Sequence, residues 1–67
     1  MPLEYLREIA NSQLPLEVSK QDDIDKLRVL VAAGMIIAKL PEVAKEGVGT
    51  VQAVTGFGRA TLKAKGG

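Results

Sequence analysis

The sequence has no cysteine, no histidine and no tryptophan among its 67 residues. The lack of cysteine excludes disulfide bonds and thiolate metal sites, and the lack of histidine removes the commonest general base and the commonest metal ligand. Tyr5 and Phe57 are the only aromatic residues, so the core must be aliphatic. We therefore expect a non-enzymatic protein with no catalytic residue, no cofactor and no metal site.

Long apolar runs are also missing. The longest run, between Arg28 and Lys39, has 10 residues, whereas a membrane-spanning helix needs about 20. The N-terminus has an early acid and no apolar segment typical of a secretory signal. These features predict a cytoplasmic protein with no membrane partner.

The chain is short and nearly neutral. It predicts one small domain over residues 1–67, with little core to stabilise it. The formal net charge of +1 is not that of a strongly basic nucleic-acid binder. The charges are nevertheless divided, with six acids and two bases in residues 1–25, and seven bases and two acids in residues 26–67. The two parts carry −4 and +5, a division that can steer a partner or guide contacts between copies.

The first part of the chain reads as a helix followed by a short extended segment. Residues 2–12 place their apolar side chains on one helical face, after a proline that suits a first turn. Residues 14–18 favour a brief edge strand because Pro15 disfavours a helical conformation at the residue before it.

A second helix is predicted over residues 23–33. Its apolar spacing stops before Gly34, which suits the left-handed position after a helix. The preceding residues resemble a capping box, and the capping side chain is open between Ser19, Asp22 and Asp23.

The remainder of the chain predicts a β-hairpin and a third helix. Residues 35–40 and 50–55 read as its two strands, joined by an exposed loop over residues 41–49. A short helix then runs from residue 56 to about residue 64, with the final residues, 62–67, expected to fray. Thr55 is its predicted cap, and its predicted anchors are Phe57 and Leu62.

The glycines of this third helix do not indicate a nucleotide site. Gly56 and Gly58 begin like a dinucleotide-binding fingerprint, but Thr61 stands where a third glycine or alanine is needed. No acid follows within the remaining six residues. We interpret the pattern as a capped turn whose glycines permit close backbone packing.

Two stretches resemble the winged helix-turn-helix family. Leu27-Arg-Val-Leu-Val-Ala-Ala-Gly-Met-Ile is similar to the end of a recognition helix entering the wing, and Val54-Thr-Gly-Phe-Gly-Arg-Ala-Thr-Leu62 is similar to the exit from it. The predicted elements have the order helix, short strand, helix, β-hairpin (the wing) and short C-terminal helix, and the resemblance implies that they form a small winged-helix-like α+β fold. A full winged helix has one more helix before the recognition helix, so this chain would be a reduced version.

The resemblance implies that the chain binds duplex DNA, as a transcriptional regulator or as a DNA-associated accessory protein. Phosphate contacts would then come from five basic side chains, Lys26, Arg28, Lys39, Lys45 and Arg59. A recognition helix normally presents basic or amide groups near its start. Here that start carries Asp22, Asp23 and Asp25, which repel phosphate.

The apolar content of residues 29–40 favours a different function. One helix and one hairpin cannot cover every side of this stretch, and self-association would hide the remainder. We therefore expect a small binding domain that acts by protein-protein interaction, as a homodimer or with another protein, and we keep DNA binding as the alternative.

Overall fold

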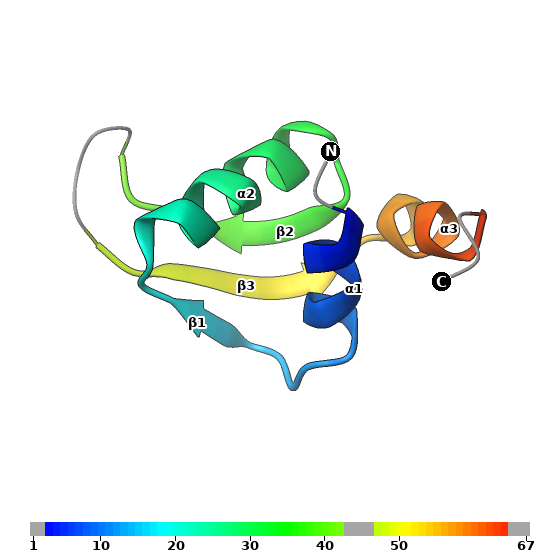
Figure 1. Cartoon of the computed structure of the whole chain (residues 1–67), viewed down its shortest axis with the longest axis horizontal. Helices are drawn as coiled ribbons and strands as arrows, with labels where there is room; N and C mark the ends of the chain where they lie inside the picture. Colours follow the sequence, from blue (N-terminus) through cyan, green and yellow to red (C-terminus); the bar gives the residue numbers. More distant parts are fainter. Residues whose placement is uncertain (1–2, 43–46, 65–67) are drawn as a thin grey trace.

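The computed structural model describes residues 3–42 and 47–64 (Figure 1). In chain order, the elements are α1 (Leu3–Ala10), β1 (Leu16–Val18), α2 (Gln21–Ala32), β2 (Ile36–Lys39), β3 (Gly49–Val54) and α3 (Gly56–Ala64). This is the predicted α+β order of helix, strand, helix, hairpin and helix. None of the described helices is both long enough and apolar enough to cross a membrane.

The three strands form one antiparallel sheet in the order β1-β3-β2. Thr50 on the central strand pairs with Glu17 of β1 on one side and with Lys39 of β2 on the other. The β2–β3 register then shifts, because Ile37 pairs with Ala53 whereas its neighbour Ala38 pairs with Val51. The shift is a β-bulge, which raises the local twist of the sheet.

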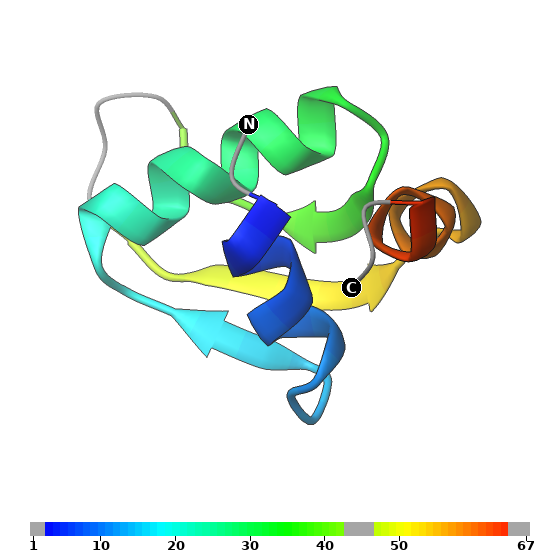
Figure 2. The ribbon, with the colours of Figure 1, turned by 45° about the vertical axis from the view of Figure 1, so that its right-hand side comes forward.

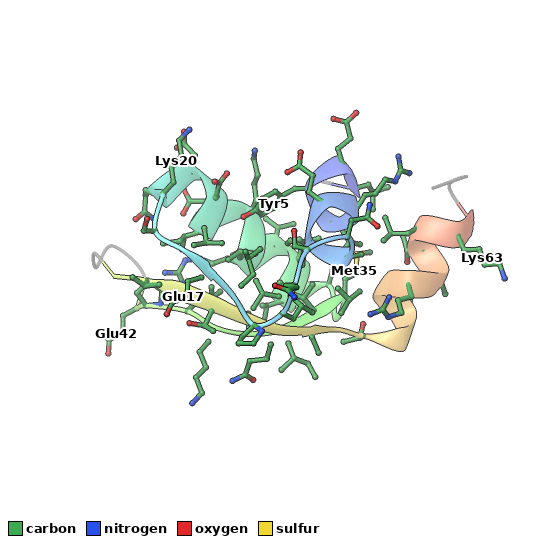
Figure 3. All side chains as sticks on the ribbon, turned by 90° about the horizontal axis from the view of Figure 1, so that it is seen from below. Tyr5, Glu17, Lys20, Met35, Glu42 and Lys63 are labelled. Carbon is green, nitrogen blue, oxygen red and sulfur yellow. The ribbon has the colours of Figure 1, made fainter. Side chains whose placement is uncertain are left out.

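Helices α1 and α2 lie on the same face of the sheet (Figure 3). Their apolar stripes and the central strand supply the side chains that have no exposed surface, Leu6, Ile9, Ile24, Leu27, Leu30 and Val51. The helical members recur at intervals of three, which keeps them on the inner side of each helix. The core is thus aliphatic, as the scarcity of aromatic residues predicted.

Helix α2 begins earlier than predicted, and the predicted cap is wrong. Lys20 occupies the cap position and makes no side-chain capping hydrogen bond. Ser19 therefore lies one residue too early to cap, while Asp22 and Asp23 lie inside the first turn. There the two carboxylates still favour the helix because they face its positive end. Gly34, by contrast, has the predicted left-handed conformation, with φ of 77°.

Helix α3 is attached to the end of the sheet through hydrogen bonds among four residues (Figure 2). We call this cluster the corner, and it consists of Gly34, Met35, Thr55 and Gly58. The Thr55 backbone N–H donates to the Met35 carbonyl at 2.9 Å. The Thr55 hydroxyl accepts from the Gly58 N–H at 3.0 Å, which confirms the predicted cap, and donates to the Gly34 carbonyl at 2.6 Å. A Cβ atom on Gly58 would overlap the Met35 carbonyl oxygen, so only glycine fits there.

Of the two anchors predicted for this helix, one is confirmed and the other is wrong. Leu62 is buried, but Phe57 is 59% exposed because it lies on the outer side of the first turn. The predicted end of this helix near residue 64 is confirmed, because α3 runs to Ala64, and the fraying expected over residues 62–67 stays a prediction. Residues 65–67 lie outside the described residues.

Candidate interaction surface

The face of the sheet opposite α1 and α2 is not covered by any described helix or strand (Figure 3). Strand alternation, strand pairing and the β-bulge, at which Gln52 is the extra residue, place six side chains on it. We call this surface the open face, and it consists of Glu17, Ile37, Lys39, Thr50, Gln52 and Ala53.

The apolar part of the open face is centred on Ile37. Its side chain is 54% exposed, whereas that of its neighbour Ile36 is only 3% exposed. Successive strand side chains point to opposite faces, so two adjacent isoleucines cannot both reach the core. Ala53 lies directly across from Ile37 and is half-buried. The pair therefore presents aliphatic surface to solvent near the end of the β2–β3 hairpin that adjoins α3.

The charged part of the open face lies along one row across the sheet. Glu17 and Lys39 are both exposed, and Thr50 separates them on the central strand. Neighbouring strands lie about 4.8 Å apart, so the backbones of the acid and the base are about 10 Å from each other. Each charge is therefore available to a partner.

Two of the predicted phosphate contacts already have partners within the chain. Lys26 Nζ lies 3.9 Å from Asp23 Oδ1 and 5.4 Å from the centre of the Tyr5 ring. Arg28 is half-buried, and its Nη2 donates to the Pro41 carbonyl at 2.5 Å. Arg28 thus ties helix α2 to the segment after β2.

Tyr5 beside Lys26 titrates at a higher pH than usual. Partial burial raises the pKa of its phenol, and the negative charges of Asp23 and Glu8 raise it further. The ring therefore stays neutral through the physiological range. It provides a face for the lysine.

The four predicted basic residues that the structure describes do not gather on one surface. Lys26 is on helix α2, on the covered side of the sheet, whereas Lys39 is on the open face. Arg59 is exposed on α3, and Lys45 lies outside the described residues. Asp22 and Asp25 are exposed at the start of α2, the helix that the resemblance assigns to recognition.

The expectation that apolar residues of 29–40 stay uncovered is confirmed. Val29, Val31 and Ile37 are 46%, 37% and 54% exposed. Glu17 was not among the residues predicted from the sequence. The sequence could show only that Glu17 lies between the inward-facing Leu16 and Val18 and therefore faces solvent. Its alignment with Lys39 follows from the strand pairing alone.

The described residues contain a hollow but no cluster of metal-binding side chains. Within ranges 3–42 and 47–64, no three acidic side chains come together to hold a metal ion. A hollow near the start of α2 is lined by Ser19, Gln21, Gly47 and Val48, none of which titrates near neutral pH.

Comparison of the chain with protein families, with curated proteins and with solved structures finds no match in any of the three.

Proposed function

We propose that this chain is a non-enzymatic interaction domain that self-associates through its open face. The observation that carries the proposal is the exposure of Ile37 beside Ala53 on a sheet face that no described element covers. Antiparallel sheets commonly leave one face to solvent, but that face is then usually polar. The exposed isoleucine beside Ala53 therefore supports an assembly that removes this part of the face from water.

Size favours the same function. A chain of 67 residues buries a small fraction of its surface compared with larger domains. Removing apolar surface from water contributes about 25 cal/mol for each Å², so a second layer over the open face would supplement the small core.

Sedimentation velocity over a wide range of protein concentration tests this proposal. We expect a monomer–dimer equilibrium that Ile37→Gln shifts strongly toward monomer. Val29→Gln is the matched control, because it also removes an exposed aliphatic side chain but on helix α2, away from the open face. A chain that stays monomeric at millimolar concentration would refute the proposal, as would equal effects of the two variants.

A reduced winged helix that binds duplex DNA is the second candidate. It is supported by the corner at which the two stretches of the resemblance meet, where Thr55 bonds to Gly34 and Met35. The dispersed basic side chains and the acidic start of α2 count against it.

An amide NMR titration with a short random duplex separates the two candidates. Shifts confined to residues 24–28, 39–50 and 59 that fade as salt is raised would favour DNA binding, because phosphate contacts release counterions. We expect no such shifts at moderate salt.

A further inference from the structure

The charges of the open face are arranged so that the face can match a copy of itself. Glu17 and Lys39 lie in one row, on opposite sides of Thr50 and one strand away from it. Consider a two-fold axis that is parallel to β3 and lies just above the open face. A rotation of 180° about this axis sets β1 of one copy over β2 of the other copy. Glu17 of each copy then faces Lys39 of the other copy, so the pair contains two such contacts.

We infer that a second copy of this chain docks face to face on the open face, related by a two-fold axis parallel to β3. Glu17 of each copy then lies opposite the partner's Lys39, and Thr50 lies on the axis. This inference rests on the proposed self-association and specifies its geometry.

The apolar contacts agree with the same axis. Ala53 is on β3, as Thr50 is, so it meets the partner's Ala53, and Ile37 of each copy packs beside that contact. Facing sheets pack about 10 Å apart, within the combined reach of a glutamate and a lysine. Packed sheets are usually rotated by about 30° relative to each other, which moves each charge little because the charge lies only one strand from the axis.

The charges also oppose a second symmetric arrangement. A two-fold axis perpendicular to the strands, along the charged row, would place β1 over β1 and β2 over β2. Glu17 would then face the partner's Glu17, and Lys39 the partner's Lys39, and like charges in contact oppose association. An unrelated partner would need its own matching acid and base, whereas a second copy supplies both.

Charge reversal tests the arrangement. Glu17→Lys sets two lysines opposite each other in both contacts, and Lys39→Glu sets two glutamates opposite each other. We expect each variant to raise the dimer dissociation constant about tenfold or more, since two favourable contacts become two repulsive ones. Lys63→Glu and Glu4→Lys change the net charge equally on exposed sites of α3 and α1, and should leave dimerisation unchanged.

Two recombinations make the test specific. An equimolar mixture of the Glu17→Lys and Lys39→Glu chains should dimerise, because every contact in the mixed dimer joins an acid to a base. The double variant Glu17→Lys/Lys39→Glu should dimerise like the original chain for the same reason.

The outcomes separate this geometry from the proposed function. A monomeric original chain overturns both. An original chain that dimerises, with charge-reversed variants that dimerise equally well or a mixture that fails to recover, overturns the two-fold arrangement and leaves self-association standing. Circular dichroism of each variant verifies that it is folded, which is expected because both side chains are exposed.

Discussion

The two faces of the sheet are built by the same three strands but have different chemistry. The covered face presents Val51 and Ile36, both buried under the helices, with no polar side chain in the core of the described residues. The open face presents one acid, one base, a threonine, a glutamine and only two aliphatic side chains. The covered face therefore supplies stability, and the open face is the one that we propose binds a second copy of the chain.

The largest loss of stability is expected on the covered side, for Leu27→Ala. Leu27 has no exposed surface and packs against the backbone of β3, since a Cβ on Gly49 would lie 3.3 Å from Leu27 Cδ1. The variant should lose about 2–5 kcal/mol of unfolding free energy, which a small domain cannot easily sustain. Urea unfolding followed by circular dichroism measures the loss. A loss below about 1 kcal/mol would mean that α2 does not pack through this face.

A smaller loss is expected at the corner that attaches α3, for Gly58→Ala. The added Cβ has no room because it meets the backbone carbonyl of Met35, which cannot move aside as a flexible side chain can. Overpacking of this kind costs about 1–3 kcal/mol, even though alanine is the better helix former. Gly56→Ala is the control, since a Cβ there meets nothing within 4 Å. Equal melting temperatures for the two variants would contradict this account of the corner.

Thr55→Val should cost somewhat less at the same corner. The substitution keeps the shape of the side chain but removes both hydroxyl hydrogen bonds, to the Gly58 N–H and to the Gly34 carbonyl. Loss of a capping hydroxyl costs about 0.5–2 kcal/mol. Thr61→Val is the matched control, because that hydroxyl bonds only to the Phe57 carbonyl within the exposed part of α3. If thermal melts rank the control as the more damaging change, Thr55 does not hold the corner.

Most of the fold can be read from the sequence because its signals are local. Apolar spacing locates the helices, Gly34 marks the end of α2, and Thr55 marks the start of α3. The errors also have local causes. Ser19, Asp22 and Asp23 all suit a helix start, and the helix begins at Gln21 without using any of them as a cap.

The open face was much harder to predict than the helices. A strand that alternates between core and solvent shows which residues share a face, but not which residues of another strand lie beside them. The alignment of Glu17 with Lys39 depends on a sheet order that sets β3 between two strands distant from each other in sequence. The position of Phe57 was missed for a similar reason, since its exposure depends on how α3 meets the sheet.

The smallest effect is expected for Ile37→Thr, and it compares the two faces directly. In dilute solution, where the chain is monomeric, replacing this exposed residue should change the unfolding free energy by less than about 0.5 kcal/mol. Val51→Thr makes the same aliphatic-to-hydroxyl change on the covered face of the same sheet, and should cost about 1–3 kcal/mol because the hydroxyl is buried without a partner.

As the protein concentration is raised, the original chain should gain stability by mass action while Ile37→Thr gains little. Parallel rises in melting temperature would indicate that association uses another surface, so the concentration series measures what Ile37 contributes beyond the fold.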